Sequence, residues 1–210
     1  MDSKLNFINH ITSIVSKAKS TLGFIKRFCY DVRNVQSLKS LYYALVQSIL
    51  EYCCVVWLPF HNTRINQIES VQIQFTMFAL REYQTAENGY HIAPYNDRLS
   101  RLEMTKLERR RMEIAILLFY DIINGIIHCP NLRDAIIINL NERNLRESTI
   151  ERFKLAKTSH RMTTYAPINQ MCKLANIVSN LFDEATSRSN FKSRIKVSDK
   201  LNLRLKNTDH

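Results

Sequence analysis

Residues 37–53, SLKSLYYALVQSILEYC, carry the clearest helical pattern in the chain and decide its fold class. Their apolar side chains recur at intervals of three and four residues, the spacing of one face of an α-helix. The predicted inner face consists of Leu38, Leu41, Tyr42, Leu45, Val46, Ile49 and Cys53. Asn34 is a suitable N-cap, and Pro59 disfavours helical backbone in the residue before it. An amphipathic helix is therefore expected between these two positions.

Amphipathic helices are also predicted on both sides of this stretch. The helix before it spans residues 5–28, with an inner face of Ile8, Ile11, Ile14, Val15, Ala18, Leu22 and Ile25. Gly23 late in this helix predicts a kink or a close helix contact. The helix after it is capped by Asn62 or Thr63. Its predicted inner face consists of Ile65, Ile68, Val71, Gln72, Phe75 and Phe78.

The second half of the chain is predicted to be helical as well. Residues 80–94 are poor in apolar side chains and mark the expected boundary. Asp97 opens the next helix, with Ser100 and Glu103 spaced as a capping box and Gly125 as its stop. The β-branched run Ile136–Ile138 is compatible with one short strand, residues 139–159 are irregular, and residues 171–182 are helical again. We expect an all-α protein with a helical bundle over 1–85, a second helical module over 95–185 and a basic tail over 186–210.

Composition supports this fold class and suggests an anionic partner. The chain has 210 residues but only 3 glycines, where average usage would give about 15, so many tight hairpins are not expected. Its 30 Lys and Arg against 19 Asp and Glu give a net charge of +11. Such a surface attracts nucleic acid or an anionic membrane surface. No stretch is long and apolar enough to predict a transmembrane helix, which needs about 20 residues.

The five cysteines show no spacing typical of a metal site or a disulfide framework. An odd number of cysteines without a signal peptide favours reduced thiols, so we expect an intracellular protein, nuclear or cytoplasmic and not secreted. The thiols are interpreted as small core residues. No metal, other cofactor, membrane or small-molecule substrate is expected as a partner.

A series of motifs resembles the region after the polymerase core of jockey-like non-LTR retrotransposon reverse transcriptases. The most specific ones are Leu22-Gly23-Phe24-Ile25-Lys26-Arg27, Leu41-Tyr42, Leu45-Val46, Leu50-Glu51-Tyr52, Trp57, Pro59, Ile68-Glu69-Ser70-Val71-Gln72 and Phe75. Weaker ones lie at residues 2–11, 98–111, 165–176, 183 and 191–192. The resemblance therefore covers nearly the whole chain.

The resemblance implies a thumb-like bundle that closes over a primer–template duplex, with RNA and DNA as ligands. It also implies the palm of a complete reverse transcriptase as a protein partner, and it would place that palm before Met1. The family's metal-binding Asp-Asp pair is absent from these 210 residues, so no catalysis is expected. The alternative is a non-functional or structural remnant that needs the palm to fold well. In that case Leu41, Leu45 and Phe75 would form an orphaned apolar face.

Basic side chains are the candidates for contact with nucleic acid. Lys26 and Arg27 close a family motif, and the alternative is that they only offset the helix dipole. Lys106, Arg109, Arg110 and Arg111 form the densest basic cluster, with an ion network to neighbouring glutamates as the alternative. Lys192 and Arg194 belong to the basic tail, which either binds phosphates or is a solubilising end.

Aromatic and acidic motif residues are interpreted as structural. Tyr42, Tyr52 and Trp57 have the sequence context of core residues, although aromatic rings can also stack with unpaired bases. Glu51 and Glu69 lack the acidic partner of a two-metal site. They are expected to bind Arg or Tyr groups and so to orient the helices.

Overall fold

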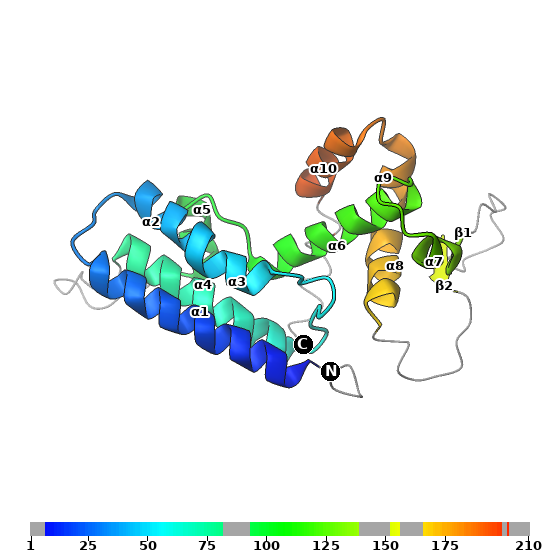
Figure 1. Cartoon of the computed structure of the whole chain (residues 1–210). Helices are drawn as coiled ribbons and strands as arrows, with labels where there is room; N and C mark the ends of the chain where they lie inside the picture. The colour runs from blue at the N-terminus through cyan, green and yellow to red at the C-terminus, as the bar shows by residue number, and fades with distance from the viewer. Residues whose placement is uncertain (1–6, 82–92, 139–151, 156–165, 199–200, 202–210) are drawn as a thin grey trace. The chain divides into compact units, whose positions relative to one another are not determined.

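The computed structural model describes residues 7–81, 93–138, 152–155, 166–198 and 201, and these are predominantly helical, as predicted (Figure 1). The chain forms two compact units that divide between Arg110 and Arg111. The expected boundary at residues 80–94 lies mostly outside the described residues. Because the two units divide after Arg110, the first unit continues past the predicted bundle end at residue 85.

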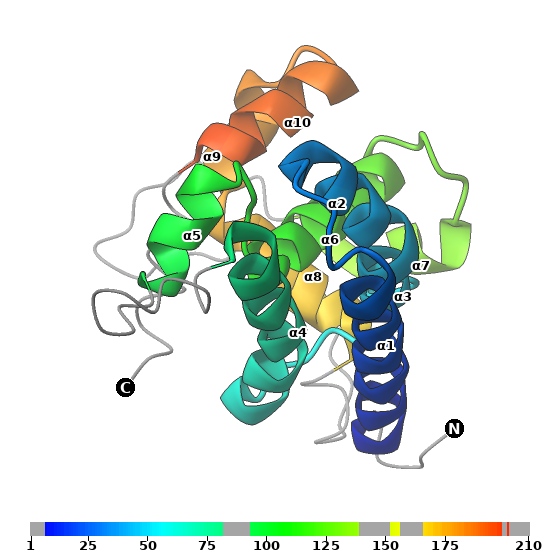
Figure 2. The same ribbon diagram turned by 90° about the vertical axis from the view of Figure 1, so that its left-hand side faces the viewer.

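The first unit is built on α1 (Ile8–Phe28), whose buried face follows the predicted pattern. The buried residues are Ile11, Val15, Ala18, Leu22 and Ile25. This face packs against α4 (Asn62–Leu80), and Figure 2 shows the two helices side by side. Gly23 was expected to bring helices close together, but an added Cβ would lie 3.8 Å from Arg27 Nη1, which is ordinary contact. The close helix contact predicted for this glycine is therefore not found.

The stretch around residues 37–53 changes from α-helix to π-helix and back to α-helix. It consists of α2 (Val35–Tyr42), a π-helix (Tyr43–Gln47) and α3 (Ser48–Glu51). A π-turn holds more residues than an α-turn, so positions four apart stay on one face. The buried positions are Leu38, Tyr42, Val46, Leu50 and Cys54. Leu45, predicted to face inward, is exposed for this reason. Cys53, also predicted to face inward, is exposed in the turn after α3, where its φ is 50°.

Of three further expectations for this unit, one is confirmed and two are corrected. The predicted cap of α2 is confirmed, since Asn34 Oδ1 accepts a hydrogen bond from Ser37 N at 3.1 Å. The N-cap of α4 is His61, whose side chain makes no capping bond, and not Asn62 or Thr63. Phe75 was a candidate for an orphaned face but is fully buried, because its ring stacks on Tyr42 with centroids 4.1 Å apart.

The predicted capping box does not form. Ser100 lies inside α5 (Tyr95–Arg101), where its hydroxyl donates to Asn96 O at 3.1 Å. Glu103 follows that helix with φ 51°, a left-handed conformation. The next helix, α6 (Leu107–Ile123), begins only after this turn.

The second unit contains most of α6 and a short antiparallel sheet. Gly125 follows α6 with φ 70°, as expected for a glycine that ends a helix. After α7 (Pro130–Asp134), β1 (Ile136–Ile138) pairs with β2 (Phe153–Leu155) in the register Ile136–Leu155, Ile137–Lys154 and Ile138–Phe153. The short strand is thus confirmed. Its partner was not predicted, because it lies in a polar and irregular stretch.

An aromatic cluster forms the core of the second unit. The Phe182 ring contacts the rings of Phe119 and Tyr120 in α6 and the ring of Phe153 in β2. Phe153 also contacts Phe119. The Tyr120 ring stacks on Phe191 with centroids 4.1 Å apart. These rings join β2 and α6 to α9 (Ser179–Glu184) and α10 (Arg188–Val197). Asn176, in α8 (Pro167–Ile177), binds both the N–H and the C=O of Phe153 at 2.9 and 3.0 Å.

The segment predicted as a basic tail is folded over residues 188–197. Within α10, Phe191 and Ile195 are buried, and Ser187 caps the helix by accepting from Asn190 N. The end of the predicted tail, residues 202–210, lies outside the described residues.

The cysteines are only partly core residues. Cys54 and Cys172 are buried as predicted, whereas Cys53 is exposed and Cys29 and Cys129 are half-buried.

Candidate nucleic-acid interface

A carboxylate from α4 holds the N-terminus of α6, the helix that carries the predicted arginine cluster. Glu69 is 8% exposed and accepts hydrogen bonds from the backbone N–H groups of Leu107 at 3.1 Å and Glu108 at 3.3 Å. It also accepts one from the Tyr95 hydroxyl at 2.6 Å. The first N–H groups of a helix lack internal partners and carry partial positive charge, so a carboxylate stabilises them. The predicted role of Glu69 in orienting helices is confirmed.

Glu51 has the same kind of role at the end of α3. Its carboxylate accepts two hydrogen bonds from Arg110, from Nε at 2.6 Å and from Nη2 at 3.1 Å. Gln47 Nε2 donates to the same carboxylate at 2.8 Å. The Arg110 guanidinium thus joins α6 to α3, and the predicted role of Glu51 as a partner of Arg is confirmed.

The four basic residues of the α6 cluster do not share one exposed surface. Arg109 is 5% exposed and Arg111 is 1% exposed, while Lys106 is half-buried. Successive helical residues point about 100° apart, so a helix that packs on its neighbours buries some of three consecutive arginines. A phosphate must touch a guanidinium to bind it, and the structure presents only part of this cluster to solvent.

The solvent face of α1 is basic. The helix has 21 residues and carries Lys17, Lys19, Lys26 and Arg27 without any Asp or Glu. Lys17, Lys19 and Arg27 are exposed, and none of them pairs with a described carboxylate. Lys26 is half-buried, and this burial lowers the pKa of its ammonium group.

A shallow, open groove of about 590 Å³ follows the same helix and is lined by side chains of α1 alone. It is lined by small polar side chains and one lysine: Asn9, Thr12, Ser13, Ser16, Lys17, Ser20 and Thr21. No acidic side chain is among these lining residues.

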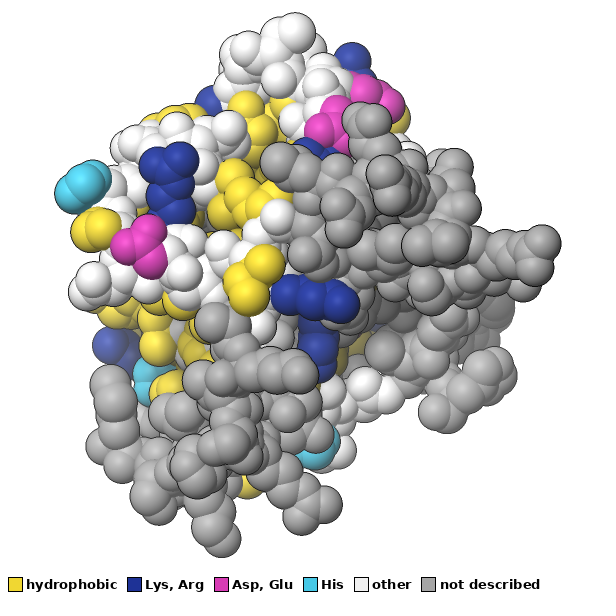
Figure 3. Space-filling view, turned by 90° about the vertical axis from the view of Figure 1, so that its right-hand side faces the viewer, with side chains coloured by type: hydrophobic (Ala, Val, Ile, Leu, Met, Phe, Trp, Pro, Cys, Tyr) yellow, Lys and Arg dark blue, Asp and Glu magenta, His cyan; other side chains and the backbone are white. Residues whose placement is uncertain are grey.

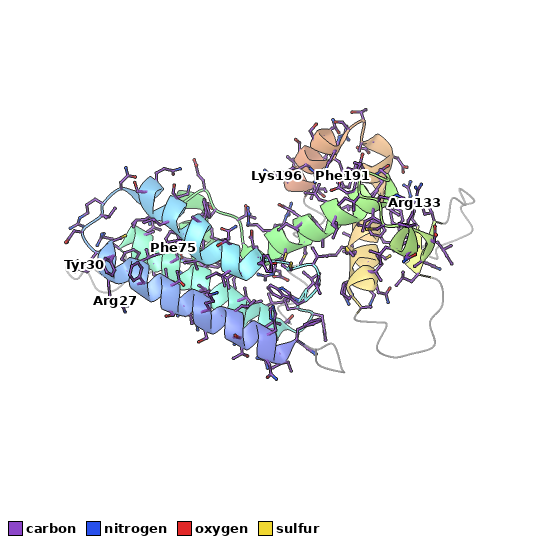
Figure 4. The ribbon with its side chains drawn as sticks, viewed as in Figure 1. Arg27, Tyr30, Phe75, Arg133, Phe191 and Lys196 are labelled. Carbon is purple, nitrogen blue, oxygen red and sulfur yellow. The ribbon has the colours of Figure 1, made fainter. Side chains whose placement is uncertain are left out.

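Exposed aromatic rings lie at the C-terminal end of α1. Phe24 is 48% exposed and Phe28 is 73% exposed, and their ring centroids are 4.2 Å apart. Tyr30, 55% exposed, follows the helix, and Figure 4 shows Arg27 and Tyr30 at this end of the unit. The spacing of Phe24 and Phe28, four residues apart and outside the buried stripe, is the sequence signal that could have revealed them.

Arg81 fixes the segment that carries Tyr30. Arg81 follows α4 with φ 52°, and its Nη2 donates to Val32 O at 2.8 Å and to Tyr30 O. Its guanidinium carbon lies 5.7 Å from the centroid of the Tyr30 ring, within cation–π range. We call Phe24, Arg27, Phe28, Tyr30 and Arg81 the aromatic–basic end.

The other aromatic candidates divide between core and surface. Tyr42 and Trp57 are buried as predicted, and Trp57 Nε1 donates to Tyr52 O at 3.0 Å. The Tyr52 side chain was expected in the core but is 76% exposed.

Helix α10 has both paired and unpaired basic side chains. Arg188 makes two hydrogen bonds, at 2.7 and 2.8 Å, to Asp121, which is 3% exposed. Arg194, a predicted site residue, pairs with Glu184. Lys192 is exposed and has no carboxylate partner among the described residues. Of the two predicted residues here, Lys192 is the more accessible to an anion.

Apolar side chains reach the surface of the second unit near its sheet. Ile126 is 54% exposed, Ile137 is 48% exposed and Ile138 is 41% exposed. Figure 3 views the side on which α7 and the strands lie, and hydrophobic side chains are visible there beside Lys and Arg.

Among the described residues, no three His, Cys, Asp or Glu side chains lie close enough together to hold a metal ion. No helix in the part of the chain that the structure describes is long and apolar enough to cross a membrane.

Comparison with known proteins gives one distant relative. No family model matches the chain. An uncharacterized protein of Caenorhabditis elegans is similar, with 26% identity over 132 residues. That match spans 63% of this chain and 64% of the relative's length. No solved structure matches.

Proposed function

We propose that this chain is a non-catalytic module of reverse-transcriptase ancestry that binds RNA and DNA through their phosphate backbones. The observation that carries the proposal is helix α1, which has four basic residues, no acidic one and three cations exposed to solvent. Lysine and arginine bind phosphates without reading sequence, and release of condensed counterions supplies the driving force.

The ancestry rests on motif residues that have a coherent structural role. Leu22, Tyr42, Trp57, Gln72 and Phe75 carry the resemblance, and all five are buried in the first unit. Tyr42 donates a hydrogen bond to Gln72 Oε1 at 3.1 Å, and Gln72 Nε2 donates to Thr105 O at 2.9 Å. A motif series that specifies one packed core supports descent from a folded domain more strongly than scattered matches would.

A specific observation also favours the alternative, a scaffold that needs a protein partner such as a polymerase palm. Leu45 is 43% exposed and Val56 is 48% exposed, besides the exposed rings of Phe28 and Tyr52. Apolar side chains left in water promote association. Concentration-dependent aggregation of the purified chain, without binding to nucleic acid, would favour this function over the first.

The test measures binding of a labelled RNA–DNA hybrid duplex by fluorescence anisotropy across a salt series. Replacing Lys17, Lys19 and Arg27 with Ala should weaken binding and reduce the slope of log affinity against log salt by about three. Replacing Lys154, Lys173 and Lys196 with Ala is the matched control, since it removes the same charge from the second unit. Equal losses in both variants, or binding that ignores salt, would overturn the assignment to α1.

A further inference from the structure

We infer that the aromatic–basic end of the first unit binds single-stranded nucleic acid, with unpaired bases stacking on the Phe24 and Phe28 rings. This inference rests on the proposed function and adds a ligand class, because phosphate binding along α1 does not by itself distinguish single strands from duplexes. The rings are the feature that phosphate binding leaves unexplained.

Exposure of the two rings leaves them accessible to a planar ligand. Their centroids lie 4.2 Å apart and the ring planes are inclined by 35°, so the pair forms one continuous aromatic surface. Phe28 is 73% exposed, which is unusual for so large an apolar side chain. Every base has a flat aromatic face, and stacking on protein rings is tolerant of sequence.

The charges around the rings select a polyanion as the occupant. Between residues 24 and 33 the chain carries Lys26, Arg27 and Arg33 against Asp31 alone. Arg81 adds a fourth cation, held beside the Tyr30 ring at 5.7 Å. An apolar protein segment would gain nothing from these charges, whereas a nucleic-acid strand supplies both bases and phosphates.

The groove along α1 offers a path for the rest of the strand. Lys17 and Thr21 line it and lie seven and three residues before Phe24, so they share one side of the helix with that ring. The serine hydroxyls of the groove leave room for a backbone and can donate hydrogen bonds to phosphate oxygens. The Thr21 hydroxyl instead donates to Lys17 O at 3.1 Å. A duplex keeps its bases stacked on each other and cannot use the rings in this way.

The experiment compares two labelled strands with equal numbers of phosphates, a 20-nucleotide oligothymidine and a fully abasic strand of the same length. The wild-type chain should bind oligothymidine at least about tenfold more tightly, because stacking contributes roughly 1–3 kcal/mol per base. Replacing both Phe24 and Phe28 with Ala should remove that difference and leave binding of the hybrid duplex unchanged. Replacing Tyr52 and Val56 with Ala, two exposed apolar side chains elsewhere in the unit, is the control.

A second variant keeps the inference testable if the alanine protein misfolds. Phe28→Trp retains a stacking ring and adds an exposed indole, so oligothymidine should quench its fluorescence and the abasic strand should not. Equal affinity for the two strands, or no quenching on saturation, overturns the inference. If the hybrid duplex still binds with a steep salt dependence, the proposed function survives that result. If no nucleic acid binds, both fail.

Discussion

Glu69 in α4 accepts a hydrogen bond of 2.6 Å from the hydroxyl of Tyr95, the first residue of α5, and the same carboxylate caps α6. One buried side chain thus holds the starts of two later helices against the first bundle. This explains why the first unit extends to Arg110 although the sequence suggested an end near residue 85.

Glu69→Gln should lower the free energy of unfolding by about 1–3 kcal/mol. Helix α6 loses a negative charge at its N-terminus. The Tyr95 hydroxyl and the two backbone N–H groups then compete for one weaker acceptor. Urea denaturation measures the change. Glu103→Gln, at an exposed carboxylate, is the control. Equal stability of the two variants would contradict the capping role.

Alkaline pH should destabilise the first unit through its buried phenols. Burial raises the pKa of Tyr42 and of Tyr95, and the nearby Glu69 carboxylate raises both further. Tyrosine in an unfolded chain titrates near pH ~10, so this stabilisation is complete below that pH. Above it, the unfolded state loses protons that the folded state keeps, and stability falls by up to about 1.4 kcal/mol per pH unit for each such tyrosine.

Tyr95→Phe should therefore flatten the fall of stability between pH ~9 and ~11, where model phenols titrate. Urea unfolding at several pH values gives the slope. Tyr52→Phe, at a ring that is 76% exposed, serves as the control. Parallel pH profiles for Tyr95→Phe and the wild type would show that the Tyr95 phenol does not contribute.

Two glycines should respond to alanine in opposite directions. Gly23→Ala should raise stability by up to about 1 kcal/mol, since alanine has the higher helix propensity and the nearest atom leaves room for a Cβ. Gly125→Ala should lower it by about 1–2 kcal/mol, because φ at this position is 70° and a Cβ is strained there. Thermal unfolding distinguishes them, and a loss in both would show that α1 is more crowded at Gly23 than the structure indicates.

Substitutions of Arg110 and of Arg27 should have different effects on the free energy of unfolding and on binding of nucleic acid. Arg110→Ala should lower the free energy of unfolding by about 1 kcal/mol, because it breaks a partly exposed two-bond pair with Glu51. Arg27→Ala should leave stability nearly unchanged and weaken binding of the hybrid duplex. Denaturation and anisotropy on the same samples test both, and the reverse pattern would place the interface on α6.

Much of the fold could be predicted from the sequence, because the spacing of apolar side chains is a local property. The buried face of α1, the cap Asn34, the stop Gly125 and the strand Ile136–Ile138 all follow from short-range rules. The net charge of +11 is likewise independent of the fold. The helical class, most inner faces and the positive net charge therefore follow from the sequence alone.

Which charged and aromatic side chains reach solvent depends largely on the tertiary structure. Arg109 and Arg111 are buried and Arg110 is paired, and no local pattern distinguishes the three. Trp57 is buried and Tyr52 is exposed, although both were expected in the core. Burial depends on which neighbour covers each face, and Glu69 and Glu51 set that alignment through hydrogen bonds to residues far apart in the chain. Helical periodicity predicts which side chains share a face of a helix, and long-range packing determines which face is exposed to solvent.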